Sequence, residues 1–143
     1  MTKQTDVLAL TGRILIAALF LLSGFGKLAA PAATQGYIAA MGLPLPIAAY
    51  FGSMSVELIG SVLLLVGFQT RIVAAGLAVF TVLTAVIFHS NFADQNQVIH
   101  FWKNLAIVGG LLQIVAFGAG KFALDRGFKK QPKLSREALI PAE

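Results

Sequence analysis

The chain has 143 residues, of which 57% are hydrophobic and 12% are charged, whereas a soluble domain carries about 25% charged residues. The mean hydropathy of +0.82 agrees with this bias. A soluble domain of this length could not bury so much apolar surface, so the composition indicates a protein of the lipid bilayer. There are no cysteines, which excludes disulfides, thiol relays and cysteine-ligated metal or iron–sulfur sites.

The net charge is +5 and the isoelectric point is near 9.9, values that would suggest nucleic-acid binding in a soluble protein. Here six of the eleven basic residues gather in the last 23 positions, and no basic face with interleaved aromatic residues accompanies them. This pattern favours anionic lipid at the membrane surface, and not nucleic acid, as the partner of the basic segment.

Four apolar stretches predict four membrane-spanning α-helices, at about 7–28, 45–68, 72–89 and 101–119. Each has roughly the length that a helix needs to cross about 30 Å of hydrocarbon. Strands of a membrane barrel would be about 10 residues long and would alternate in polarity, which these stretches do not. We therefore expect an all-α four-helix transmembrane bundle over 1–120, followed by a basic interfacial segment and flexible tail over 121–143.

The connections between these stretches differ in character. The stretch from Ala29 to Pro44 contains proline and glycine and is expected to be a connecting segment. The triplet 69–71 is short enough to predict a tight turn, so that the second and third spans form an antiparallel hairpin. The stretch 89–100 is polar and is expected to be a loop.

The distribution of lysine and arginine predicts the orientation of the bundle. With four spans both termini lie on one side, and that side would carry nine of the eleven lysine and arginine residues, while the other would carry only Lys27 and Lys103. The termini and the 69–71 turn are therefore predicted to be cytoplasmic. A cleaved signal peptide is an alternative for the N-terminal stretch, but Lys27 between its apolar core and the candidate cleavage site argues against it.

Glu57 is the strongest functional signal because it lies near the middle of the second span, about 18 Å from either membrane face. An ionisable group at that depth costs several kcal/mol unless it is paired, so it normally faces the bundle interior. Two interpretations stay open. Glu57 is either a structural ion-pair partner or a carboxylate that handles protons or binds a ligand.

Arg13 lies about 9 Å into the first span and shares a helix face with Ala17, Gly24 and Lys27. Its guanidinium could extend to the cytoplasmic surface or reach toward Glu57.

A second polar level is predicted near the opposite membrane face. His89 ends the third span, Lys27 ends the first, and His100, Lys103 and Asn104 share one face of the fourth. The amide of Asn104 needs partners inside the bundle, whereas the lysine and histidine groups could extend to the surface. Lys103 lies about 10 Å from the level of Glu57, so either Lys103 or Arg13 could pair with it.

Metal and haem sites are not predicted. His89 and His100 are eleven residues apart at separate helix ends, with few carboxylates in reach. Both histidines lie at the edge of the bundle, where they could not serve as axial ligands of an interior haem.

An ordered set of short motifs resembles the DoxX family of small bacterial four-helix membrane proteins, close to its YphA/YqjF-like inner-membrane branch. The motifs cover nearly the whole chain and comprise Gly12-Arg13, Ser23-Gly24-Phe25-Gly26-Lys27, Met41-Gly42-Leu43-Pro44, Val56-Glu57-Leu58-Ile59-Gly60, Gly67-Phe68-Gln69-Thr70-Arg71, His89, Phe101-Trp102-Lys103-Asn104 and Gly118-Ala119-Gly120-Lys121.

The resemblance implies a multi-pass protein of the bacterial inner membrane. It also implies a link to quinone-coupled oxidation, as in a thiosulfate:quinone oxidoreductase subunit, or to oxidative-stress and aromatic-compound responses. The candidate residues that it carries over, without roles, are Arg13, Lys27, Glu57, Arg71, His89, Lys103 and Asn104.

Three functions remain open from the sequence. The first is an accessory, quinone-interacting subunit of a membrane redox system, with no intrinsic redox centre and with a partner protein that brings the electrons. The second is a small-molecule or proton-coupled carrier, which would need a homodimer because four spans make a thin conduit. The third is a membrane scaffold whose buried ion pair is structural.

Overall fold

The structure is a computed structural model and describes residues 2–125. This part of the chain forms the helices α1 (Lys3–Ala29), α2 (Pro31–Ala40), α3 (Pro46–Val66), α4 (Thr70–Phe88) and α5 (Gln95–Phe117). All of them except α2 are long and apolar enough to cross a membrane, which confirms the predicted all-α fold with four spans. Most of the predicted basic tail lies outside the described residues.

Two segments differ from the sequence-based expectation. The connection after the first span contains the ten-residue helix α2, which starts with Pro31, a residue suited to the first turn of a helix. At about 15 Å this helix is too short to span the bilayer. The predicted polar loop ends early, because the side chain of Asp94 accepts a hydrogen bond from the backbone N–H of Asn96 at 2.8 Å and caps α5 at Gln95.

The hairpin between α3 and α4 has the tight turn that the sequence predicts. Gly67 adopts a left-handed conformation with φ of 73°, and the N–H groups of Gly67 and Phe68 both donate to the carbonyl of Leu63 at 3.0 Å. This arrangement ends α3, and α4 begins at Thr70.

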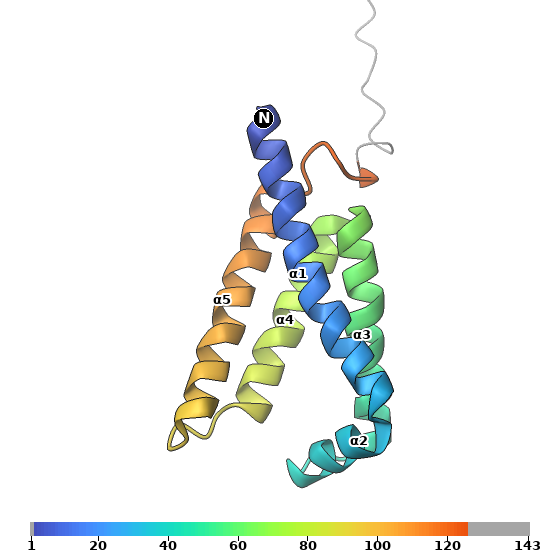
Figure 1. Cartoon of the computed structure of the whole chain (residues 1–143), viewed down its shortest axis with the longest axis vertical. Coiled ribbons are helices and arrows are strands. Elements are labelled where there is room, and N and C mark those ends of the chain that lie inside the picture. The colour runs from blue at the N-terminus through green and yellow to red at the C-terminus, as the bar shows by residue number, and fades with distance from the viewer. Residues whose placement is uncertain (1, 126–143) are drawn as a thin grey trace, which may run out of the picture.

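The spanning helices form two pairs (Figure 1). Helix α1 packs along α3, and α4 packs along α5, while α3 and α4 also touch each other. The pairs converge at the end of the bundle where α1 begins and separate toward the other end, where α2 lies (Figure 1). Helix α2 packs on α3 and α1.

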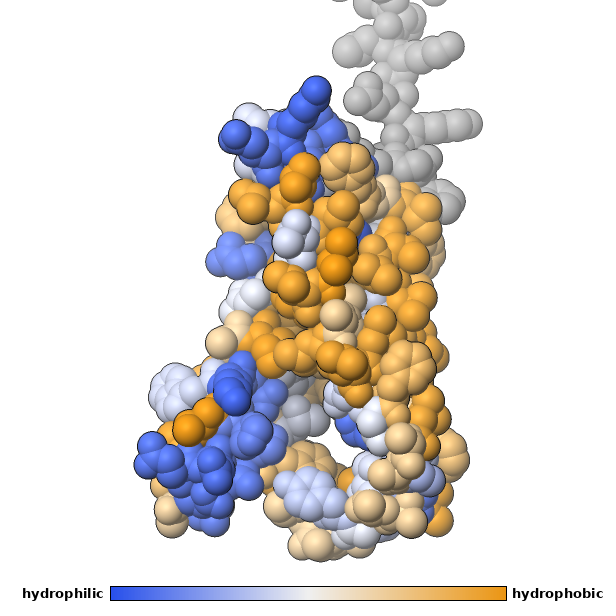
Figure 2. Space-filling model, in the orientation of Figure 1, coloured by the Kyte–Doolittle hydropathy of each residue, from blue (hydrophilic) through white to orange (hydrophobic). Residues whose placement is uncertain are grey.

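The interior is small and contains many small side chains, as expected where helices associate in lipid without a hydrophobic driving force. Its buried cluster comprises Ala17, Phe20, Leu64, Ala74, Leu77, Ala78, Leu111 and Ile114. By contrast, large apolar side chains are exposed along every span, and an apolar surface covers much of the molecule (Figure 2). Such a surface is suited to contact with lipid tails.

Gly24 sets the close approach of α1 and α3. A Cβ atom at this position would lie 2.6 Å from the side chain of Leu58 and 3.5 Å from Cβ of Glu57. Position 24 therefore lies level with Glu57 on the partner helix.

The segment 118–125, which we call the C-terminal clasp, closes the converging end of the bundle. Its Lys121 donates its backbone N–H to the Asp6 carboxylate at 3.0 Å, and the Lys121 ammonium lies 3.5 Å from the same carboxylate. The fully buried Arg13 donates to the carbonyls of Leu64 and Leu65 in α3 and of Phe122 in the clasp. Arg13 is thus a cross-link between α1, α3 and the clasp.

Asp125 connects the clasp to α4. Its carboxylate accepts hydrogen bonds from the backbone N–H groups of Gln69 at 2.6 Å and Thr70 at 2.9 Å, and so caps α4. Burial of this carboxyl acts to raise its pKa, but the Thr70 hydroxyl, the two amides and the charge of Arg13 together hold the pKa below its ordinary value.

The clasp also bears on the topology. Because Lys121 contacts Asp6, the start of α1 and the segment after α5 lie at the same end of the bundle. This is the arrangement that an even number of spans requires. Its assignment to the cytoplasmic side stays a prediction from the charge distribution.

Asp125→Asn should lower the stability of the protein at neutral pH by about 1 kcal/mol, the usual value of a helix cap. Because the folded state lowers the pKa of Asp125, its contribution is present above about pH 4 and is lost as the pH falls through the lower folded value. Thermal unfolding in detergent micelles between pH 7 and pH 3 measures both effects. The variant should lose less stability on acidification than the parent does. An unchanged acid response in Asp125→Asn would contradict this role.

Candidate functional site

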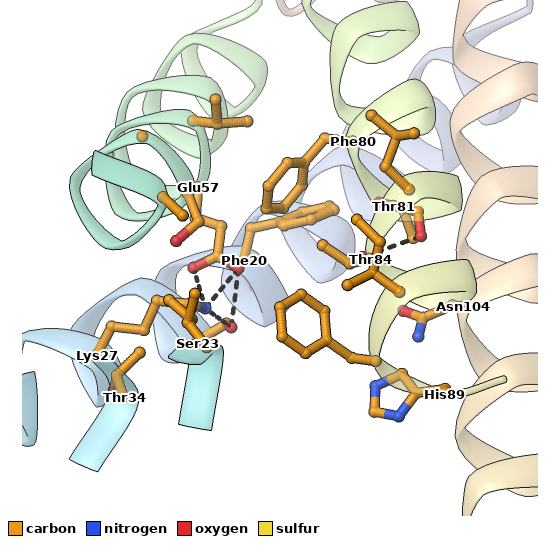
Figure 3. A pocket seen from close by; sticks show the side chains of 18 of the residues that line it. Phe20, Ser23, Lys27, Thr34, Glu57, Phe80, Thr81, Thr84, His89 and Asn104 are labelled. Atoms are coloured by element: carbon orange, nitrogen blue, oxygen red, sulfur yellow. Dashed lines mark hydrogen bonds and ion pairs between the residues drawn. The ribbon is translucent and has the colours of Figure 1, made fainter. Parts of the chain in front are cut away.

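Lys27, Glu57 and Ser23 form a compact charged cluster between α1 and α3 (Figure 3). The Lys27 ammonium donates to both carboxylate oxygens of Glu57 at 2.7 Å and to the Ser23 hydroxyl oxygen at 3.0 Å. The Ser23 hydroxyl donates to Oε1 of Glu57 at 3.1 Å. The three N–H groups of the ammonium therefore all have acceptors within the cluster.

The local fold holds this cluster in place. Glu57 is only 4% exposed, and it lies beside Gly24, where the two helices leave no room for a side chain on α1. The buried Tyr50 of α3 donates its hydroxyl to the backbone carbonyl of Lys27 at 3.2 Å. A second contact between α1 and α3 thus lies next to the ion pair.

The pairing of Glu57 with Arg13 or Lys103, expected from depth along the helix axes, is wrong. The partner is Lys27, which the sequence places near the membrane face. Side chains on a helix lean toward its N-terminus, so Lys27 reaches back to the level of Ser23, one turn deeper. The sequence-based estimate took the depth of the Lys27 backbone as the depth of its ammonium group. It therefore placed the ammonium group too close to the membrane face.

A pocket of about 590 Å³ lies between the two helix pairs on the side of α2. The space-filling view shows the molecule hollowed in this region, between α2 and the nearby ends of α4 and α5 (Figure 2). Most of its lining is apolar, and four aromatic side chains contribute to it, namely Phe20, Tyr37, Phe80 and Phe88.

Polar groups line the pocket on two opposite walls (Figure 3). Lys27, Glu57 and Ser23 belong to the wall of α1 and α3, whereas His89 and Asn104 belong to the wall of α4 and α5. Among residues 2–125, the side-chain amide of Asn104 has no hydrogen-bond partner. A primary amide in an apolar interior costs free energy unless it is hydrogen-bonded, so this group is available to a ligand.

His89 has one occupied and one free ring nitrogen. Its Nδ1 lies 2.8 Å from Oε1 of Gln97, and its ring stacks on that of His100 with centroids 5.1 Å apart. Nε2 has no hydrogen-bond partner in the described part of the chain. The predicted polar level is therefore built around His89 and Asn104, with His100 and Gln97 behind them.

The pocket includes four of the predicted site residues, namely Lys27, Glu57, His89 and Asn104. Two others lie elsewhere. Arg13 belongs to the clasp end of the bundle, and Lys103 is exposed and does not line the pocket, although it neighbours Asn104 in sequence. Arg71, a candidate from the family resemblance, donates to the carbonyl of Ala116 at 3.3 Å and so links α4 to α5.

The sequence-based selection did not include Ser23 or the aromatic residues of the pocket. The spacing of Ser23, four residues before Lys27, is a signal that could have identified it, because such residues are neighbours on a helix. The aromatic residues carry no comparable signal, since apolar side chains face both lipid and pocket. Within residues 2–125 no group of three or more metal-ligating side chains occurs.

Comparison with known proteins shows which family the chain belongs to. The family model described as DoxX matches residues 8–90, which include α1 from Leu8 onward, all of α2, α3 and α4, and the whole Lys27–Glu57 cluster. The chain belongs to the DoxX family. It is 43% identical to the inner membrane protein YqjF of Escherichia coli K12, over 92% of this chain and 99% of that protein.

A second relative in the same organism is the inner membrane protein YphA, which is 34% identical over 84% of this chain and 89% of its own length. No solved structure matches the chain. Together with the four membrane-length helices, these relatives make the DoxX protein described here a multi-pass inner-membrane protein.

Replacement of either member of the ion pair should destabilise the protein, because the remaining member would be left without its partner. For a buried pair the cost is about 3–5 kcal/mol, and the partial exposure of the Lys27 side chain, 21%, places the expected value at about 2–3 kcal/mol. Unfolding of Lys27→Met and Glu57→Gln in detergent micelles measures it. The double variant should lose less stability than the sum of the two.

Lys103→Met is the matched control for this experiment, since it removes an exposed lysine from the same end of the bundle and should change stability by less than about 0.5 kcal/mol. Strict additivity of Lys27→Met and Glu57→Gln would show that the contact does not contribute to stability.

Proposed function

We propose that this DoxX protein binds a small aromatic molecule of the quinone class in the pocket, and that it serves as an accessory subunit of a membrane redox or oxidative-stress system. The observation that carries the proposal is the Asn104 amide, which has no partner among residues 2–125 and lines a mostly apolar pocket at membrane depth. A group of this kind gains a hydrogen bond when a ligand carbonyl or hydroxyl enters.

The size and lining of the pocket support a single-ring ligand. Pockets for small molecules usually measure about 300–1,000 Å³ and are mainly apolar with a few oriented polar groups. The volume of about 590 Å³ falls within this range. The rings of Phe20 and Phe80 offer surfaces on which a flat ring can pack, and the polar groups on opposite walls suit a ring with oxygen atoms at opposite positions.

The hydrogen bonds within the protein indicate which polar groups of the pocket are free to bind a ligand. The ammonium of Lys27 is fully used by Glu57 and Ser23, so this cluster presents mainly the outer lone pairs of the Glu57 carboxylate to a ligand. Asn104 and His89 supply the free hydrogen-bonding groups on the other wall. The chain binds and orients the ring, while a partner protein of the redox system would exchange electrons with it.

The binding role predicts that Asn104→Leu, which keeps the size of the side chain and removes its amide, weakens binding of a short-chain ubiquinone analogue roughly tenfold or more. Equilibrium binding to the purified protein in micelles, followed by fluorescence or calorimetry, provides the measurement. Lys103→Ala is the matched control, because this neighbouring residue is exposed and outside the pocket, and its affinity should stay within about twofold of the parent. No binding by the parent, or equal loss in both variants, would overturn the proposal.

A proton-coupled carrier is the second candidate, favoured by the carboxylate of Glu57 lying at the wall of a pocket deep in the membrane. This role predicts proton flux in proteoliposomes that Glu57→Gln abolishes and that Lys103→Ala preserves. Flux that is equal in empty liposomes and in both variants would exclude the carrier. A folded parent protein that shows neither flux nor quinone binding would leave the scaffold as the function.

A further inference from the structure

The hydrogen bond between His89 and Gln97 determines whether the pocket offers a donor or an acceptor to a ligand at this position. The inference drawn from it rests on the function proposed above. Oε1 of Gln97 is a carbonyl oxygen and can only accept a hydrogen bond, so Nδ1 of His89, 2.8 Å away, donates its proton to it. In the neutral ring Nε2 then carries no proton and can only accept.

Nε2 is the ring nitrogen that a ligand can reach. His89 lines the pocket at the end of α4, and Figure 3 shows its ring at the edge of the cavity with one nitrogen turned inward. His100 covers one face of the ring, and Gln97 occupies Nδ1, so the free edge is the one that carries Nε2.

The opposite wall of the pocket also offers a hydrogen-bond acceptor. The carboxylate of Glu57 is an acceptor, and the donors beside it, Lys27 and Ser23, are already directed at it. A ligand that lies between the two walls therefore meets an acceptor at each end, the Glu57 carboxylate and Nε2 of His89. A carbonyl oxygen has no proton to give to either, whereas a hydroxyl group has one.

We propose that the pocket selects aromatic ligands with hydroxyl groups at opposite ends of the ring, the hydroquinone form, over the corresponding quinone. Asn104, whose amide both donates and accepts, serves either form and supplies affinity without discrimination. Gln97 does not line the pocket and acts as a positioning residue that fixes which nitrogen of His89 carries the proton.

The test compares three compounds that share one ring: a short-chain quinone, its hydroquinone and the dimethyl ether of that hydroquinone. Affinities for the purified full chain are measured anaerobically with a reductant present for the hydroquinone, at about pH 8, where histidine side chains are ordinarily neutral. The hydroquinone should bind roughly tenfold tighter than the quinone, about the effect of one well-placed hydrogen bond, and the dimethyl ether should bind no better than the quinone.

Two variants identify the origin of the preference. Gln97→Leu removes the acceptor that fixes the ring, and His89→Phe removes the ring nitrogens, so each should reduce the ratio of hydroquinone to quinone affinity to about 2 or less. Quinone binding by Gln97→Leu should stay within about threefold of the parent, because Gln97 does not line the pocket. The matched control is Asn96→Ala, at the position next to Gln97. The Asn96 side chain is exposed and makes no hydrogen bond among residues 2–125, so this variant should keep the full ratio.

Each result separates this inference from the binding function on which it rests. Equal affinity for the two forms, or tighter binding of the quinone, would overturn the selectivity and leave the quinone-class pocket intact. A preference that survives in both Gln97→Leu and His89→Phe would overturn the role of the histidine. Failure of all three compounds to bind would remove the proposed function together with the inference.

Discussion

A carboxylate in the middle of a bilayer is stable as an anion only beside a cation, and here Lys27 supplies that cation to Glu57 at 2.7 Å. This requirement brings α1 against α3 so closely that Gly24 has no room for a side chain. It also defines one wall of the pocket. Because the pair lies at the pocket wall, the same contact that joins two helices also places charge beside a pocket that has polar groups on both walls.

The two ends of the bundle are built by different interactions. At the clasp end, Arg13 and Asp6 of α1 bind backbone groups of the segment 118–125, and the carboxylate of Asp125 in that segment accepts from backbone N–H groups at the start of α4. At the other end α2 stays with α1 and α3, and its Tyr37 ring stacks on Phe88 of α4 with centroids 5.5 Å apart. The pocket lies at this less tightly connected end, where the side chains that line it come from both helix pairs.

The spans were predictable because length and apolar character suffice to identify a membrane helix, and the structure changes their ends by only a few residues, except at the start of α5. Helix α2 was not predicted because ten residues with glycine and proline nearby carry no span signal. The position of each residue along its helix correctly indicated that Glu57 and Asn104 need polar partners inside the membrane. It predicted the wrong cation for Glu57, because residue position gives the depth of the backbone and not the direction of the side chain. The role of Gln97 could not be predicted, because a glutamine in a polar loop gives no sign of which histidine it will contact.

The clasp also determines how the molecule can move. Because the four spanning helices are joined at the clasp end, the two helix pairs can separate only by rotating about that end. Their displacement would then increase with distance from the clasp. The largest opening would then occur between Tyr37 and Phe88, where one aromatic stack joins α2 to α4. For the quinone-class ligand proposed above, such an opening would provide a sideways path from the leaflet on the α2 side, while the fastened end stayed closed.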